Sequence, residues 1–221
     1  MSEPRTPGGY AEVLWDMDGT LVDTEPYWMA AEARLAERFG GPWTHEDSLA
    51  VVGFDLLDSG AYIRERLGID LEPAEIVDLL LEDVIEQVRV AVPWRAGARE
   101  LLADLGRAGV PCGLVTMSYL SFVEPILEHL PEDTFAAIVT GDGVERGKPY
   151  PDPYLEAARL LDADPADCLA IEDSNTGATS AERAGCAVLC VPNHVAVLEG
   201  ERRLFADSLE GLSAENLPVL G

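Results

Sequence analysis

Residues 10–25 read Tyr-Ala-Glu-Val-Leu-Trp-Asp-Met-Asp-Gly-Thr-Leu-Val-Asp-Thr-Glu, an apolar run that ends at two carboxylates, Asp16 and Asp18. In an extended strand residues i and i+2 point to the same side, so both carboxylates would face one small volume. Gly19 follows them, and glycine adopts backbone angles that other residues avoid. Two close carboxylates repel each other unless a cation lies between them. We therefore expect a divalent metal ion, a lysine, or both at the tip of this strand.

The rest of the chain has two kinds of pattern. Residues 25–92 show only helical patterns, whereas from Gly97 onward short apolar strands alternate with helices. Continuously apolar strands such as 113–115 are typical of parallel sheets covered on both faces. We predict an α/β fold: a doubly wound parallel sheet, with a Rossmann-like core of residues 1–24 and 93–221 and an inserted helical cap of residues 25–92. The predicted strands are 10–15, 111–116, 136–140, 168–171 and 187–191, and the predicted helices are 26–39, 45–52, 56–67, 73–92, 98–108, 120–130, 152–161 and 176–184.

The composition excludes several classes of partner. The 221 residues carry a formal net charge of -26, which would repel nucleic acid and anionic lipid. No segment has the roughly 18 consecutive apolar residues that a membrane span needs, and residues 1–9 lack the apolar run of an export signal. The four cysteines lack the spacing of a disulfide scaffold, so we expect reduced, mostly buried thiols. These features predict a cytoplasmic protein. We expect either a monomer or a weak dimer, because an apolar cap face could seal the site or form a dimer.

Acidic side chains end more than one predicted strand. Asp16 and Asp18 end the first, Glu172 and Asp173 end the fourth, and Thr116 ends the second. Ligands of open parallel sheets bind beyond the carboxyl ends of the strands, so these residues should meet in one crevice. Taken singly, each has a plain explanation as a helix cap or a solvated edge. Together they offer the hard oxygen ligands that suit Mg2+, whereas zinc would need His or Cys.

A single lysine, Lys148, stands among 15 basic residues, of which the other 14 are arginine. An ammonium is a compact point charge and a guanidinium is a broad planar fork. Codon bias explains one leftover lysine as well as function does. Its position before the helix predicted at 152–161 nevertheless places it at the same edge of the sheet as the acids.

Four segments together resemble the motifs of the haloacid dehalogenase-like hydrolases. Their cap position, between the first and second motifs, resembles the helical-cap subgroup that includes phosphoglycolate phosphatase, sugar-phosphate phosphatases and β-phosphoglucomutase. The set covers nearly the whole chain and is far more specific than any single motif. The four segments are Asp16-Met17-Asp18-Gly19-Thr20-Leu21, Leu114-Val115-Thr116, Gly147-Lys148-Pro149-x-Pro151-Asp152 and Ile171-Glu172-Asp173-Ser174-x-x-Gly177.

The resemblance implies a Mg2+-dependent phosphatase that hydrolyses a small phosphate monoester, a sugar phosphate or a phosphoglycolate-like metabolite. Asp16 would attack phosphorus and form an aspartyl-phosphate. Asp18 would give a proton to the leaving alcohol and later take one from water. Mg2+ would be held by Asp16, the backbone carbonyl of Asp18 and Asp173, with Glu172 acting directly or through a metal-bound water.

The resemblance also implies a phosphate-binding set and a specificity region. Thr116, Lys148 and the backbone N–H groups around Gly19 and at Met117 would bind the phosphoryl oxygens. The cap would close over the site and select the substrate. The candidate specificity residues are Glu25, Trp28, Gly53, Phe54 and Asp55, of which Trp28 and Phe54 could equally be packing residues.

Several alternatives remain. A halogen-removing dehalogenase would not need Asp18 or the acidic pair. A β-phosphoglucomutase-like enzyme would carry a histidine where this chain has Trp28, and an arginine in the Gly53 to Leu56 region, where there is none. A phospho-accepting receiver domain lacks so long a helical insert. A catalytically idle interaction protein would release no phosphate from any substrate.

Overall fold

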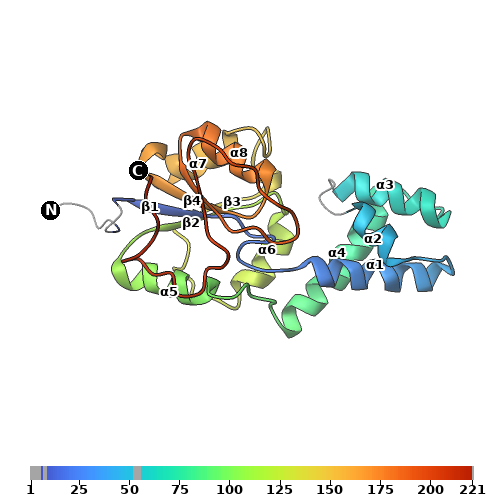
Figure 1. Cartoon of the computed structure of the whole chain (residues 1–221). Coiled ribbons are helices and arrows are strands. Elements are labelled where there is room, and N and C mark those ends of the chain that lie inside the picture. The colour runs from blue at the N-terminus through green and yellow to red at the C-terminus, as the bar shows by residue number, and fades with distance from the viewer. Residues whose placement is uncertain (1–5, 7–8, 52–55, 221) are drawn as a thin grey trace. The chain divides into compact units, whose positions relative to one another are not determined.

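The structure, a computed structural model, describes residue 6 and residues 9–51 and 56–220 (Figure 1). The chain divides into two compact units. One unit consists of Met1–Asp23 and Pro93–Gly221, and the other is Thr24–Val92. The first unit contains every strand of the described residues, and the second is helical.

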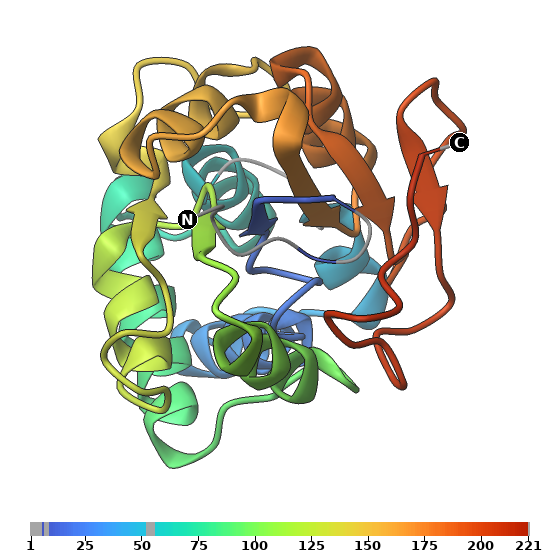
Figure 2. The same cartoon turned by 90° about the vertical axis from the view of Figure 1, so that its left-hand side faces the viewer.

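A six-stranded parallel sheet forms the centre of the first unit. Its strand order is β3-β2-β1-β4-β5-β6, and every neighbouring pair is parallel. Figure 2 shows the blue strand β1 within the sheet and the red strand β6 at its edge. This arrangement confirms the predicted α/β fold. The strands are β1 (Glu12–Trp15), β2 (Cys112–Val115), β3 (Ala137–Val139), β4 (Cys168–Glu172), β5 (Ala187–Cys190) and β6 (Arg203–Phe205).

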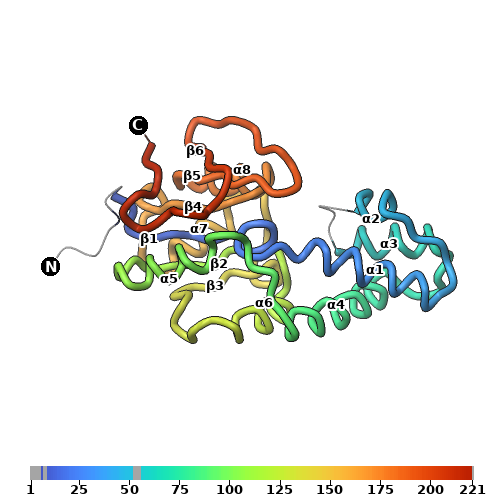
Figure 3. The backbone as a smooth tube through the Cα atoms, turned by 60° about the horizontal axis from the view of Figure 1, so that its bottom comes forward, coloured from blue at the N-terminus to red at the C-terminus, as the bar shows by residue number. Residues whose placement is uncertain are grey.

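Helices cover both faces of this sheet, as the continuously buried strands require. Helices α5 (Ala98–Ala108) and α6 (Leu120–Leu127) lie on one face, and α7 (Asp152–Leu160) and α8 (Asn175–Ala184) lie on the other (Figures 1 and 3). Two short 3-10 turns, Gly141–Gly143 and Pro165–Asp167, follow β3 and precede β4.

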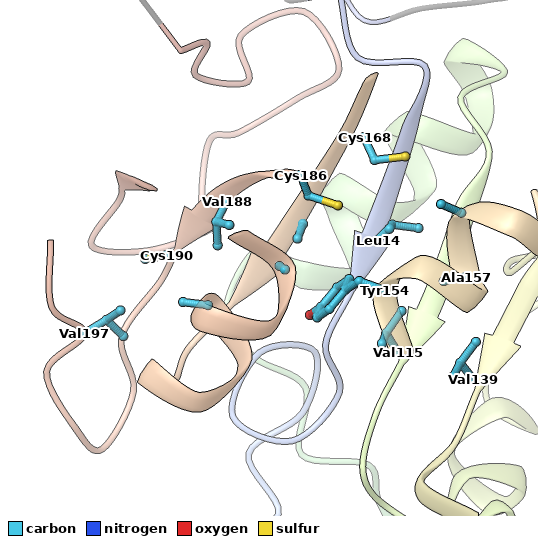
Figure 4. Packing of buried hydrophobic residues seen from close by; sticks show 14 residues of the cluster. Leu14, Val115, Val139, Tyr154, Ala157, Cys168, Cys186, Val188, Cys190 and Val197 are labelled. Atoms are coloured by element: carbon cyan, nitrogen blue, oxygen red, sulfur yellow. The ribbon is translucent and has the colours of Figure 1, made fainter. Parts of the chain in front are cut away.

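The core beneath α7 and α8 is made of small and medium apolar side chains, with the Tyr154 ring among them (Figure 4). All four cysteines are buried and free, as expected. Burial raises the pKa of the Cys112 thiol to about 12, so a reactive thiolate is strongly disfavoured there. The cluster includes Leu14, Val115, Val139, Tyr154, Ala157, Cys168, Ala170, Cys186, Val188 and Cys190.

The strand register brings the chain's polar residues to one edge of the sheet. Trp15 pairs with Leu114 on one side and with Ile171 on the other. The next residue on each strand is therefore Asp16, Val115 or Glu172, at the same level. The Asp16 N–H continues the ladder by donating to the Ile171 carbonyl at 3.0 Å. The central strands thus end together at their carboxyl ends.

The helical unit has its own core. Its helices are α1 (Glu25–Phe39), α2 (His45–Val51), α3 (Leu56–Leu67) and α4 (Pro73–Val90). Helix α4 packs against both α1 and α3. Arg66 donates to Asp47 at 2.6 Å, which lowers the pKa of that carboxyl to about 2. None of the described helices combines the length and apolar character that crossing a membrane requires.

One carboxylate of the helical unit is buried without full pairing. Glu32 on α1 is buried, and its Oε2 has no hydrogen-bond partner among the described residues. Burial raises the pKa of Glu32 to about 7, and the side chains of Ser48 and Trp43 partly oppose this shift. Glu25, on the same helix, adds to the rise by repulsion.

Several element ends shift by one or two residues from the sequence-based expectations, and the clearest differences are two helix ends and one strand. Helix α4 stops at Val90, because Ala91 is extended and Pro93 disfavours helical angles at the residue before it. Helix α6 stops at Leu127, where the chain tightens: the His129 and Leu130 N–H groups donate to carbonyls only three residues back. Strand β6 was not predicted, because its three residues are partly exposed and carry no continuous apolar pattern.

Candidate active site

Lys148 lies between two carboxylates at the carboxyl ends of β1 and β4. Its Nζ donates to Asp16 Oδ1 at 2.6 Å, to Glu172 Oε1 at 2.6 Å and to the Val115 carbonyl at 2.9 Å. The Lys148 side chain is 5% exposed and the Glu172 side chain is fully buried. All three donors of the ammonium are therefore used. The structure brings the chain's only lysine to the predicted acids.

The charges of this group are strongly coupled. Burial, and then repulsion from Glu172, raises the pKa of the Asp16 carboxyl well above its usual value, although Lys148 opposes the rise. Burial alone would lower the pKa of Lys148, but Asp16 and Glu172 raise it above its usual value. Burial and repulsion from Glu172 raise the pKa of Asp173 to about 7. One ammonium thus faces more negative charge than it can neutralise.

The donor atoms fit a divalent cation. Asp16, Glu172 and Asp173 each offer a carboxylate oxygen, and these oxygens lie within 4.8 Å of one another. Asp16 Oδ2 is buried and has no hydrogen-bond partner in the described part of the chain. A buried carboxylate oxygen without a donor is costly. An all-oxygen set with excess negative charge is what Mg2+ prefers, so the residues present fit this ion.

Asp18 is held by two hydroxyl groups from the loop after β2. Ser118 Oγ donates to Asp18 Oδ2 at 2.7 Å, and Thr116 Oγ1 donates to the same oxygen at 3.3 Å. Thr116 Oγ1 in turn accepts the Ser118 N–H at 3.0 Å. Thr116 was predicted to be at this site, whereas Ser118 was not. The spacing of two residues beyond a strand end was the only sequence signal for Ser118.

The turn after β1 depends on Gly19. Gly19 has a φ of 87°, in the left-handed region that favours glycine. A Cβ at this position would lie 2.0 Å from Asp173 Oδ2, so a larger residue would displace that carboxylate. The Gly19 N–H donates to the Val22 carbonyl at 2.7 Å. The turn uses this donor in the structure, and the role of the N–H groups around Gly19 in binding phosphoryl oxygens stays a prediction.

Met117 contacts both Gly141 and Lys148. Its N–H has no acceptor among the described residues, so this predicted phosphate-binding donor is available. Its carbonyl lies against Gly141, where a Cβ would be 2.1 Å from the oxygen. Its Sδ accepts the Lys148 N–H at 3.2 Å. Met117 therefore also positions the backbone of Lys148.

Tyr154 is a second residue that sequence reasoning missed. Its hydroxyl donates to Glu172 Oε1 at 2.6 Å, and its ring centroid lies 5.2 Å from Lys148 Nζ. Burial and the neighbouring Glu172 charge raise the pKa of Tyr154 well above its usual value, which keeps the phenol protonated as a donor. A tyrosine two residues into a helix carries no sequence pattern that predicts this contact.

The candidate specificity residues belong to the helical unit. Glu25 begins α1 and Trp28 lies one turn later, and both are partly exposed. Gly53, Phe54 and Asp55 lie outside the described residues. Their assignment to substrate selection stays a prediction.

Several known proteins resemble this chain over most of its length. Residues 13–191 match the family model described as haloacid dehalogenase-like hydrolase. The chain is 32% identical over 186 residues to the bifunctional riboflavin kinase/FMN phosphatase of Arabidopsis thaliana, covering 82% of this chain but only 48% of that protein. It is 29% identical over 191 residues to hexitol phosphatase B of Escherichia coli, covering 85% of this chain and 86% of that protein.

A solved structure resembles the chain over almost its full length. CbbY from Rhodobacter sphaeroides, in complex with xylulose-(1,5)bisphosphate, has a TM-score of 0.79 and 27% sequence identity. The match covers 92% of this chain and 96% of that chain.

Proposed function

Since the chain belongs to the haloacid dehalogenase-like hydrolase family, we propose that it is a Mg2+-dependent phosphatase that hydrolyses a small phosphate monoester through an aspartyl-phosphate. The observation that carries the proposal is the state of Asp16. One of its oxygens is held by Lys148, and the other is buried with no hydrogen-bond partner among the residues that the structure describes. A carboxylate that is oriented on one side and unsatisfied on the other is suited to attack an electrophile.

The first step displaces the alcohol. A carboxylate oxygen of Asp16 forms a bond to phosphorus while the bond from phosphorus to the ester oxygen breaks. Asp18, in its protonated form, gives its proton to the departing oxygen, so the product leaves as a neutral alcohol. Lys148 stays bonded to Asp16 Oδ1 and orients the nucleophile throughout. The Met117 N–H and the Thr116 hydroxyl would donate to phosphoryl oxygens.

The second step restores Asp16. A water oxygen forms a bond to phosphorus and the water gives a proton to Asp18, while the bond from phosphorus to the Asp16 oxygen breaks and inorganic phosphate leaves. Asp16, Asp173, the carbonyl of Asp18 and, directly or through water, Glu172 would hold Mg2+. When bound, this ion offsets the repulsion between the anionic nucleophile and the anionic phosphate. Glu172 is already satisfied by Lys148, Tyr154 and Ser174, and its main effect is to fix the lysine.

We infer that the substrate is a sugar phosphate or a phosphoglycolate-like metabolite. The name of the hexitol phosphatase relative and the sugar bisphosphate bound by CbbY support a phosphorylated polyol or sugar. Water is favoured as the acceptor over a second sugar, because Trp28 replaces the histidine that a mutase would carry. Interconversion of a sugar phosphate that depends on a sugar bisphosphate would instead indicate a phosphomutase.

The test is a panel of phosphate esters assayed with Mg2+ and with a chelator. We expect phosphate release that needs Mg2+ and is strongest for sugar phosphates or phosphoglycolate. Asp16→Asn should abolish turnover and leave the fold intact, because the amide is not an effective nucleophile. Asp133→Asn, at an exposed position of the same unit, is the matched control and should keep full activity. Appreciable Mg2+-dependent hydrolysis by Asp16→Asn would rule out this nucleophile.

A further inference from the structure

Two hydroxyl groups converge on one oxygen of Asp18, and they are not equivalent. Ser118 Oγ lies 2.7 Å from Asp18 Oδ2, whereas Thr116 Oγ1 lies 3.3 Å from it. The shorter distance is that of a strong hydrogen bond to a carboxylate, and the longer one is weak. Ser118 is therefore the main donor to this oxygen.

A hydroxyl group has a single proton to donate. If Thr116 gives its proton to a phosphoryl oxygen, as proposed above, it cannot also give it to Asp18. Thr116 Oγ1 also accepts the Ser118 N–H at 3.0 Å. This contact uses a lone pair, so the one proton of Thr116 remains available for a single acceptor. Ser118, the nearer of the two hydroxyl groups, can then still donate to Asp18 Oδ2.

The backbone around Ser118 is fixed from a neighbouring loop. The Gly141 N–H donates to the Ser118 carbonyl at 3.1 Å. Gly141 also packs so closely on the Met117 carbonyl that a Cβ would lie 2.1 Å from it. The Leu120 N–H donates to Asp142 Oδ1 at 3.3 Å and ties the start of α6 to the same loop. The backbone is therefore fixed on both sides of Ser118.

We propose that Ser118 is a positioning residue for Asp18: its hydroxyl holds Oδ2 while Asp18 transfers its proton, and this leaves the Thr116 proton for the phosphoryl group. This inference rests on the proposed phosphatase function. It predicts that the effect of Ser118 depends on the leaving group of the substrate. Ser118 matters where the leaving oxygen needs a proton and matters little where it does not.

The experiment compares two leaving groups. The unsubstituted protein, Ser118→Ala and Ser118→Thr are assayed with Mg2+ on p-nitrophenyl phosphate and on the best alkyl phosphate of the panel. The quantity compared is kcat/KM, which covers the steps up to departure of the leaving group. Ser121→Ala, at an exposed position on α6, is the matched control and should equal the unsubstituted protein on both substrates.

We expect Ser118→Ala to lose about 10- to 100-fold in kcat/KM on the alkyl phosphate, because Asp18 becomes a carboxylate as it gives up its proton and a hydrogen bond to that charge is lost. The loss should lie in kcat, with KM nearly unchanged. On p-nitrophenyl phosphate the loss should stay below about threefold, because nitrophenolate leaves without a proton. Ser118→Thr keeps the hydroxyl and should restore most of the activity.

Three results would overturn the role of Ser118. They are an equal loss on both substrates, a rise in KM with kcat unchanged, and full alkyl phosphatase activity in Ser118→Ala. If Ser118→Ala fails to fold, Ser118→Cys, which has similar volume but a weak donor, is tested by the same criteria. An unsubstituted protein that hydrolyses neither ester would instead overturn the proposed function.

Discussion

Replacing Tyr154 by phenylalanine should destabilise the protein measurably, although the change removes one oxygen atom. The phenol donates to Glu172 Oε1 at 2.6 Å, and both side chains are completely buried. Neither group can turn to water for a substitute. The substitution leaves the ring in the apolar cluster, so no large cavity adds to the cost.

The size of the loss in the free energy of unfolding depends on which hydrogen bonds Glu172 retains. A hydrogen bond to a charged group contributes about 1.5–3 kcal/mol. Glu172 Oε1 retains the Lys148 ammonium at 2.6 Å, so its charge stays compensated and the low end applies. We expect a loss of about 1.5–2 kcal/mol in the free energy of unfolding, which for a chain of this size corresponds to about 3–8 °C in Tm.

Differential scanning calorimetry of the full chain measures this shift. Tyr150→Phe is the matched control, because Tyr150 is half-exposed and its ring faces the Arg146 guanidinium rather than a buried carboxylate. Its Tm should stay within about 1 °C of the unsubstituted protein. A Tyr154→Phe variant that melts with the unsubstituted protein would refute the reasoning. The desolvation of the phenol would then cancel all that its hydrogen bond contributes.

Two further predictions concern buried charge. Lys148→Met should lower the free energy of unfolding by about 3–5 kcal/mol, because it leaves Asp16 and Glu172 buried without their cation. Arg146→Met, on the exposed part of the same loop, should lower it by under about 1 kcal/mol. Equal urea midpoints for the two variants would contradict this prediction. Burial raises the pKa of Glu32 from 4.5 to about 7, so the folded protein retains a proton in this window and its stability falls as pH rises through it. Glu32→Gln should remove this dependence and raise Tm at pH 8, and an unchanged pH profile of Tm would contradict the assignment.

The parts of the fold that could be predicted from sequence are those with local signals. The apolar run before Asp16 and the alternation of strands and helices after Gly97 reflect burial on two faces, and both patterns are continuous along the chain. Strand β6 has no such signal, since its place in the sheet comes from pairing with β5. The end of α6 could not be predicted either, because the tighter turn after Leu127 comes from backbone hydrogen bonds and not from a pattern of residue types.

The residues of the site also include some that could be predicted from sequence and some that could not. Asp16 and Lys148 could be assigned because their residue types are unusual where they stand: an acid directly after a buried strand, and one lysine among arginines. Ser118 and Tyr154 could not, because serine and tyrosine are common and their partners lie 100 and 18 residues away. The hydrogen bond of the Gly19 N–H within the turn could not be predicted for a related reason. Sequence shows that a turn follows Asp18, but not which carbonyl its donor will meet.

The two chain segments that lead to and from the helical unit are tied together within the first unit. The Asp23 N–H donates to the Pro93 carbonyl at 2.8 Å, the Arg95 N–H donates to the Leu21 carbonyl at 3.0 Å, and Val22 forms an antiparallel bridge with Trp94. The 69 residues of Thr24–Val92 therefore enter and leave through a short ribbon that is already closed at its base. A ribbon of this kind accepts an insert of any length without disturbing the register of β1 and β2. It makes the position after Asp23 a natural point for exchanging one helical insert for another during evolution or in the laboratory.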